Sequence, residues 1–285
     1  MSLPFVKMPF VKMHGLGNDF VILDARKNAF QLTPAQIQRI ADRNRGVGCD
    51  QVIVLKNSPK SADLYMGIYN ADGSEAAACG NATRCVADLE MNARGVNQLS
   101  IESPYDVLHA SRSNVLGGTN ITVDMGTALT EWNAIPLSKH MDTLNIDVGI
   151  AALPPAVGVN MGNPHAVFFV KHVDKTDIAT LGRQVEHHTL FPARTNVEFV
   201  EVKDRTHMRM RVWERGAGIT LACGSGACAV MVAAVRRGLT ERKADIELDG
   251  GILHMEWLDN GHVLMTGPVA TSFTGELSEA FLSLK

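Results

Sequence analysis

The chain has no apolar run long enough to form a membrane-spanning helix. Such a helix needs about 18 or more consecutive apolar residues, and the best candidate, from Ala227 to Val235, has nine. The N-terminal stretch also lacks an uninterrupted apolar segment followed by a small-residue cleavage site. No secretion signal is indicated, so we expect a cytoplasmic protein without a membrane partner.

Charge of one sign is not concentrated anywhere in the sequence. The 27 basic and 30 acidic residues leave a net charge of -3, and no long Lys/Arg block is present. A nucleic-acid partner would require a basic patch or stripe. We therefore expect no nucleic-acid partner and predict a small-molecule ligand.

Cysteines are few, and the common cofactor-binding loops are missing. Five cysteines, an odd number in a chain of this length, fit reduced thiols better than a disulfide framework. Gly15-x-Gly17 and Gly46-x-Gly48 lack the third glycine of a dinucleotide fingerprint, and no phosphate loop ends in Gly-Lys-Ser/Thr. His187-His188 has no further ligand at metal-binding spacing, so no metal is predicted.

Many short strands interrupted by a few helices predict a mixed α/β fold. Thr33 as N-cap, Pro34 in the first turn and Gln36 as its partner predict a helix that runs to Arg45 and ends at Gly46. Alternation predicts a strand over residues 207–213, with its apolar side chains on one face.

Two segments begin with Ala-Cys-Gly and continue as helices of small residues. They span Ala78–Cys85 and Ala222–Cys228, and a strand-like run precedes each of them. Cys79 and Cys223 should therefore each lie at a helix N-terminus. The same order of strand, loop and helix, occurring twice, suggests an internal repeat.

Four pairs of distinctive positions share nearly one offset, which supports the repeat. The first two pairs lie 145 residues apart and the last two 144: Asn18 with Asn163, Gln51 with Asn196, Asn70 with Glu214, and Cys79 with Cys223.

The repeat predicts two pseudo-symmetric halves, residues 9–123 and 124–269, with the active site in the cleft between them. We expect residues 270–285 to pack back on the first half. Residues 1–8 are interpreted as a start-site or expression-derived extension, because Pro-Phe-Val-Lys-Met occurs twice in succession at the N-terminus.

Two opposed thiols suit the inversion of a stereocentre. A thiolate removes a proton from one face of a tetrahedral carbon, and a thiol delivers a proton to the other face. A helix N-terminus should lower the pKa of each thiol. The backbone N–H groups of Gly80-Asn81 and Gly224-Ser225 should bind a substrate carboxylate and stabilise the charge that develops there.

These motifs resemble those of diaminopimelate epimerase. The segments that carry the resemblance are Asn70–Ser74, Ala78–Asn81, Glu214–Gly216 and Ala222–Gly226, with support from His14–Phe20, Gly48–Gln51, Asn163–His165 and Arg194–Glu198. The resemblance implies two halves, each with a mixed or antiparallel sheet wrapped around a central helix.

The same resemblance implies an isomerase that interconverts LL- and meso-diaminopimelate in lysine and cell-wall precursor biosynthesis, without pyridoxal phosphate or another cofactor. Cys79 and Cys223 would be the catalytic pair, and His165 and Glu214 would assist them. A homodimer is compatible with this interpretation. The implied substrate contacts are Asn18, Gln51, Asn70, Gly80, Asn81, Asn163, Asn196, Glu214, Arg215, Gly224 and Ser225.

Less specific interpretations stand beside this one. A single cysteine before glycine is most often a buried structural residue; Cys85 and Cys228 are expected in the core, and Cys49 is expected to be partly accessible. The nearest alternative function is a proline or hydroxyproline racemase. A cysteine hydrolase with His165 as base, or a noncatalytic ligand-binding relative, is a more distant alternative.

Overall fold

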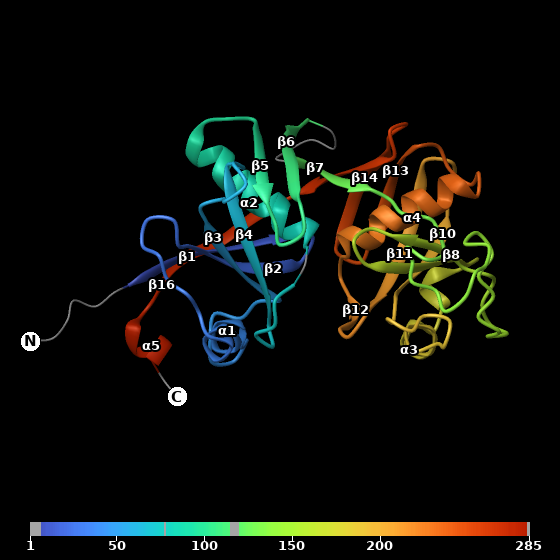
Figure 1. The fold of residues 1–285 in the computed structure, drawn as a ribbon, viewed down its shortest axis with the longest axis horizontal. Helices are drawn as coiled ribbons and strands as arrows, with labels where there is room; N and C mark the ends of the chain where they lie inside the picture. Colours follow the sequence, from blue (N-terminus) through green and yellow to red (C-terminus); the bar gives the residue numbers. More distant parts are fainter. Residues whose placement is uncertain (1–6, 77, 115–119, 284–285) are drawn as a thin grey trace, which may run out of the picture. The chain divides into compact units, whose positions relative to one another are not determined.

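Residues 7–76, 78–114 and 120–283 are described by a computed structural model, in which the chain divides into two units (Figure 1). The first unit combines residues 1–112 with 268–285, and the second spans 113–267. The division falls before β7 (Asn120–Thr127), whereas the expected division at 123/124 lies inside that strand. Most of the expected N-terminal extension, residues 1–6, lies outside the described residues, but Met8 already begins β1.

The first unit contains a seven-strand run in the order β16-β1-β2-β3-β4-β5-β6. The C-terminal segment supplies β16, which pairs antiparallel with β1. The helix α2 contacts β1, β2 and β5 of this sheet. The elements are β1 (Met8–Gly15), β2 (Asn18–Asp24), α1 (Pro34–Ala41), β3 (Gln51–Lys56), β4 (Leu64–Asn70), α2 (Gly80–Arg94), β5 (Gln98–Glu102), β6 (Val107–Ser113), β16 (Ala270–Leu277) and α5 (Glu279–Ser283).

The second unit has the strand order β7-β15-β14-β13-β11-β10-β9-β8, with β12 paired to β11. The helix α4 contacts β8, β9, β10, β13 and β14, and Figure 1 shows it among these strands. Besides β7, the elements are β8 (Val157–Asn160), β9 (Pro164–Phe169), the short 3-10 helix η1 (Val173–Lys175), α3 (Ile178–Glu186), β10 (Asn196–Val202), β11 (His207–Glu214), β12 (Gly218–Thr220), α4 (Gly224–Arg236), β13 (Lys243–Leu248), β14 (Gly251–Trp257) and β15 (His262–Pro268).

The two units repeat one sequence of strand pairings, which confirms the predicted halves of like topology. In the first unit β1/β2 is antiparallel, β2/β3 parallel, β3/β4 antiparallel, β4/β5 parallel and β5/β6 antiparallel. In the second unit β8/β9, β9/β10, β10/β11, β11/β13 and β13/β14 follow the same alternation. The helices α2 and α4 hold equivalent places in this order.

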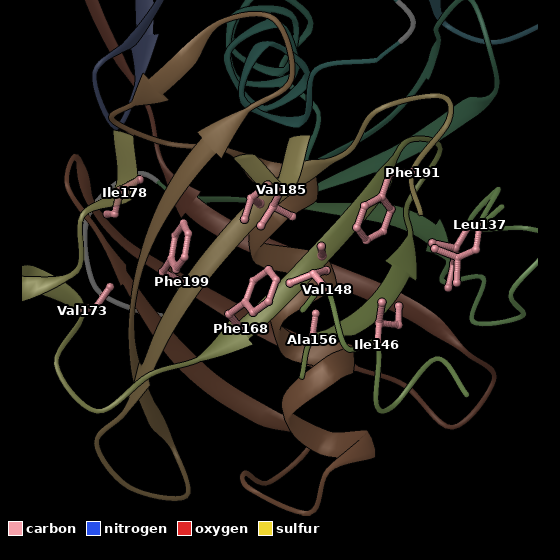
Figure 2. Close-up of a cluster of buried hydrophobic side chains, with 13 residues drawn as sticks. Leu137, Ile146, Val148, Ala156, Phe168, Val173, Ile178, Val185, Phe191 and Phe199 are labelled. Carbon is pink, nitrogen blue, oxygen red and sulfur yellow. The ribbon is translucent and has the colours of Figure 1, made fainter. Parts of the chain in front are cut away.

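The strands β9 and β10 are buried on both of their faces. In the second unit, Phe168 of β9 and Phe199 of β10 stack with ring centroids 5.8 Å apart, in a core that also includes Ile178 and Val185 of α3 (Figure 2). Glu198 lies on the opposite face of β10, because neighbouring strand residues point to opposite sides. That second face is the one covered by α4.

The first unit has the same arrangement of faces. Val21, Val52 and Val54 pack in one core cluster with Ile37 and Ile40 of α1. Burial on both faces explains the nearly continuous apolar runs of β2 and β3, which are typical of sheets covered on both sides.

The predicted start of α1 is confirmed, but its predicted end is wrong. Thr33 and Gln36 form a complete capping box. The helix stops at Ala41, because the carboxylate of Asp42 accepts hydrogen bonds from the backbone N–H groups of Asn44 and Arg45 at 2.8 and 2.9 Å. An Asp side chain that bonds nearby backbone in this way competes with continued helix.

The structure gives no helix among its described residues that is long and apolar enough to cross a membrane.

Candidate active site

Cys79 caps the N-terminus of α2, as the sequence predicts. Its backbone is extended at φ −151° and ψ 101°, and its sulfur accepts a hydrogen bond from the N–H of Ala82 at 3.5 Å. The side chain is half-buried. The residue that follows, Gly80, is buried and begins the first turn of the helix without a side chain beside the thiol.

A chain of amide side chains surrounds Cys79. Its sulfur lies 3.8 Å from Oδ1 of Asn18, and the same oxygen accepts from Nδ2 of Asn81 at 3.1 Å. Nδ2 of Asn18 in turn donates to Asp50 at 2.8 Å. Nearby in the sheet, Gln51 donates to Oδ1 of Asn70 at 3.0 Å, in register across β3 and β4.

Two buried oxygens of this group have unused hydrogen-bonding capacity. Oε1 of Gln51 and Oδ1 of Asn81 have no hydrogen-bond partner among the described residues. A buried acceptor without a partner costs about 1–3 kcal/mol. Such a cost is offset when a bound molecule brings donors, so the pair marks a place for N–H or O–H groups of a ligand.

Cys223 caps α4 in the same way. Its backbone is extended at φ −127° and ψ 109°, its sulfur accepts from the N–H of Gly226 at 3.4 Å, and Oγ of Ser225 lies 3.6 Å away. Unlike Cys79, this residue is only 5% exposed. Gly224 and Ser225 form the first turn of the helix, as Gly80 and Asn81 do in α2.

The strands around Cys223 supply the predicted polar residues. Oδ1 of Asn196 accepts from the backbone N–H of Arg215 at 2.9 Å, and its Nδ2 donates to the carbonyl of Pro164 at 3.0 Å. Glu214 accepts a hydrogen bond from the hydroxyl of Thr220. Arg215 is exposed, and its guanidinium donates to the carbonyl of Ala193 at 3.0 Å.

His165 is fully buried between two oxygens. Nδ1 lies 2.7 Å from Oε1 of Glu198, and Nε2 lies 2.9 Å from Oδ1 of Asn163. Both His165 and Glu198 are 0% exposed. The histidine therefore connects a buried carboxylate to one of the predicted substrate contacts.

The electrostatics of Cys223 differ from the expectation. Burial raises the pKa of this thiol well above its ordinary value, and the nearby carboxylates of Glu214 and Glu198 act in the same direction. Hydrogen bonds from Ser225 and Gly226 lower the pKa, but their effect is smaller, and the pKa of the thiol stays raised. The prediction that the helix N-terminus lowers the pKa is thus wrong for Cys223, because removal of the sulfur from water outweighs the backbone N–H groups.

Burial also raises the pKa of Glu214, although hydrogen bonds from Thr220 and Cys223 partly offset this effect. A raised pKa extends the pH range in which the carboxyl holds a proton. Carboxyl groups with pKa values shifted by burial are typical of active sites.

The predicted residues lie at the ends of neighbouring strands in each unit, together with the helix start that follows. In the first unit they begin β2 and β3, end β4 and cap α2; in the second they precede β9, begin β10, end β11 and cap α4. Each unit thus collects its own residues around its own thiol. The first set is Asn18, Gln51, Asn70, Cys79, Gly80 and Asn81; the second is Asn163, His165, Asn196, Glu214, Arg215, Cys223, Gly224 and Ser225.

Two functional candidates were missed from the sequence. Asp50 orients the amide of Asn18, and Glu198 contacts His165. Glu198 follows Asn196 by two positions in a strand, so the period-two rule puts both on one face. That rule could have found Glu198.

The expectations for the remaining cysteines have different outcomes. Cys85 and Cys228 are buried as expected, but Cys49, which was expected to be partly accessible, is only 2% exposed.

Comparison with known proteins adds a family to this geometry. The family model for diaminopimelate epimerase matches residues 10–130 and 157–272. The diaminopimelate epimerase of Rhodospirillum centenum is 56% identical over 275 residues, which cover 96% of this chain and 93% of the relative. That of Acidiphilium cryptum is 50% identical over 275 residues, covering 96% and 98%.

Solved structures with low sequence identity share the fold. A hydroxyproline epimerase from Agrobacterium vitis has a TM-score of 0.69 at 14% identity, over 97% of this chain and 93% of that chain. A predicted epimerase from Pseudomonas aeruginosa has a TM-score of 0.69 at 18% identity, over 95% and 99%.

The mixed α/β fold in two like units is the one found in these epimerases. Within that class, the family model and the relatives are specific. The chain belongs to the diaminopimelate epimerase family.

Proposed function

We propose that this protein is an isomerase that interconverts LL- and meso-diaminopimelate in lysine and cell-wall precursor biosynthesis. Its partner is a small amino-acid substrate, and no nucleic acid or membrane takes part. The observation that supports the proposal best is the pair of cysteines that cap equivalent helices, α2 and α4, in two units of like topology. Family membership supplies the substrate.

In the proposed reaction one cysteine takes a proton from the substrate and the other cysteine gives a proton to it. The thiolate of Cys79 or Cys223 takes the proton from the α-carbon, and the electron pair of the broken C–H bond remains on that carbon. The other cysteine then gives its S–H proton to the opposite face and becomes the thiolate. The product leaves with inverted configuration, and the two protonation states are exchanged.

In the proposed binding mode, the N-termini of α2 and α4 and the amide side chains near them bind the substrate. The first N–H groups of α2 and α4 would hold the carboxylate next to the α-carbon, where charge grows as the proton leaves. Gln51 and Asn81 have acceptor oxygens without partners, which suit an ammonium group. Glu214 and Arg215 would hold a second charged end, since the substrate has two amino-acid ends.

A racemase for a smaller substrate is the nearest alternative. The relatives that are 46–56% identical are diaminopimelate epimerases, whereas the hydroxyproline epimerase is 14% identical. Identity that low supports a shared fold alone. A cysteine hydrolase would leave one of the two capping thiols without a task.

The test is incubation of the purified protein with LL-diaminopimelate in deuterated water. We expect meso-product to form and deuterium to enter the α-position, both followed by NMR and mass spectrometry. Proline, incubated in parallel, should neither racemise nor exchange. Absence of exchange with LL-diaminopimelate would refute the proposal, and exchange with proline alone would favour the alternative.

Single cysteine variants test the two-base scheme. Cys79→Ala and Cys223→Ala should each lower epimerisation by at least about 100-fold, which is the scale of a lost acid or base. Cys228→Ala is the matched control, because Cys228 lies inside α4 and is fully buried. It should retain epimerisation once the folded fraction is taken into account. Full activity in either capping variant would rule the scheme out.

Assembly and location complete the proposal. We propose a homodimer, supported by β16, which has β1 as its strand neighbour at one end of the described sheet and leaves Phe273 49% exposed. Unpaired edge strands are common pairing surfaces. Sedimentation velocity should give the mass of two chains.

We also propose a cytoplasmic location, because a site with two free thiols needs a reducing compartment. Cell fractionation tests this location.

A further inference from the structure

Glu198 is a buried carboxylate that the proton transfer itself does not use. It lies on the face of β10 that α4 covers and is 0% exposed. Its Oε1 lies 2.7 Å from Nδ1 of His165, while its Oε2 has no hydrogen-bond partner among the described residues. A carboxylate buried with one oxygen unsatisfied is costly. A role of this charge in the site would offset that cost.

Gly226 brings this carboxylate close to the second thiol. A Cβ atom built on Gly226 would lie 2.8 Å from Oε1 of Glu198 and 3.2 Å from Sγ of Cys223. The carboxylate and the sulfur therefore both lie close to the side of Gly226 where a side chain would be. Any side chain at position 226 would crowd both atoms.

The contact with His165 has a defined direction. A carboxylate only accepts hydrogen bonds, so the Nδ1–H group of His165 donates a hydrogen bond to Oε1 of Glu198. This contact sets the plane of the ring. Nε2 of the same ring lies 2.9 Å from Oδ1 of Asn163, so the position of the ring also decides where Asn163 finds its contact. Glu198 thus acts on a predicted substrate contact without touching the substrate.

We propose that Glu198 is a positioning residue of the active site: its carboxylate fixes the His165 ring, and its charge acts on the nearby sulfur of Cys223. The inference rests on the proposed function only for its effect on turnover. The contact with His165 and the proximity to Cys223 stand without it.

The charges around Cys223 act in the direction that this role requires. The titratable groups that face the sulfur within the described part of its unit are Glu214 from β11 and Glu198 from β10, with His165 of β9 behind them. Burial and both carboxylates raise the pKa of Cys223. Removal of the charge of Glu198 should therefore lower it, so that the thiolate forms at lower pH.

The test follows the ionisation of Cys223 directly. The rate of Cys223 alkylation by iodoacetamide is measured against pH by peptide mass spectrometry in the unchanged protein and in Glu198→Gln. We expect the midpoint to fall by about one pH unit, or about tenfold in thiolate fraction at neutral pH. Glu102→Gln, which removes a buried carboxylate from the first unit, should leave the midpoint unchanged. An unchanged midpoint in Glu198→Gln overturns the proposal.

Two further measurements separate charge from packing. Glu198→Asp keeps the charge, so its midpoint should stay near that of the unchanged protein; a fall as large as in Glu198→Gln would indicate packing and overturn the proposal. The ¹⁵N NMR spectrum of the unchanged protein should show a proton on Nδ1 of His165. A bare Nδ1 overturns the positioning role, and this holds even where Glu198→Gln does not fold.

Turnover distinguishes this inference from the proposed function. In Glu198→Gln we expect kcat for diaminopimelate to fall about tenfold or more, with a smaller change in KM. A variant that loses only thermal stability, with the kcat and alkylation midpoint of the unchanged protein, contradicts the role. An unchanged protein without epimerase activity refutes the proposed function, while the alkylation midpoints still decide on Glu198.

Discussion

At the scale of single residues, burial decides the chemistry of a thiol more than its neighbours in sequence do. Cys49 lies in the core beside α1, and burial raises its pKa to about 11. An unfolded thiol titrates at about 8.5. Between these values the folded protein keeps a proton that the unfolded chain loses, so stability falls as pH rises, by up to about 1.4 kcal/mol per pH unit.

Cys49→Ala should therefore flatten the alkaline loss of stability. We expect the free energy of unfolding, from urea titrations between about pH 8 and 10, to fall less steeply than in the unchanged protein. Cys85 and Cys223 also have raised pKa values, so some slope remains. Val52→Ala is the control: it removes volume from the same core cluster without removing a titrating group. It should lower stability by a similar amount at every pH, and an equal flattening there would contradict the account.

At the scale of elements, local hydrogen bonds explain where the sequence predicts well and where it does not. The start of α1 is predictable because its capping box lies within four consecutive residues, from Thr33 to Gln36. Its end is not, because Asp42 accepts from backbone N–H groups beyond the helix and ends it before the glycine that suggests a stop. A polar side chain that competes with helix backbone has no periodic signal.

The capping box should contribute measurably to stability, since α1 has only eight residues. In the capping box, the side chain of Gln36 accepts a hydrogen bond from the backbone N–H of Thr33 at 2.9 Å. Thr33→Ala removes the side-chain acceptor and should lower the free energy of unfolding by about 1 kcal/mol in urea titration. Thr33→Ser keeps the hydroxyl and should cost much less. Equal losses in the two variants would show that the methyl group, and not the cap, is responsible.

At the scale of the whole molecule, the repeat was predictable because it rests on residues with unusual chemistry. The cysteines, amides and Glu214 recur at strand ends and helix starts, and the strand pairings follow the same order in both units. The residues proposed for the site on each unit could thus be chosen from the sequence, and their roles remain predictions. The ionisation of Cys223 could not be predicted, because it depends on desolvation and on Glu198, which comes from a neighbouring strand.

The division of the chain was harder to predict for a related reason. Strand pairing between distant segments decides which residues join a unit, and β16 pairs with β1 across almost the full length of the chain. Leu277 of β16 and Phe10 of β1 share one core cluster with α1. The expectation that residues 270–285 pack on the first half agrees with the first unit, which includes residues 268–285, but local patterns in the sequence do not specify that β1 is the strand that pairs with this segment.

This closure of the first unit by the C-terminal strand predicts unequal effects of truncation. Removal of residues 268–285 leaves one edge of β1 without its partner and takes Leu277 from the core. In hydrogen-exchange mass spectrometry we expect lost protection in β1 and β2, while β9 and β10 of the second unit keep theirs. Removal of 279–285 alone is the control, because it deletes α5 and leaves β16 in place. Equal loss of protection in both units would show that they unfold as one cooperative body, and the C-terminal strand would then not stabilise the first unit selectively.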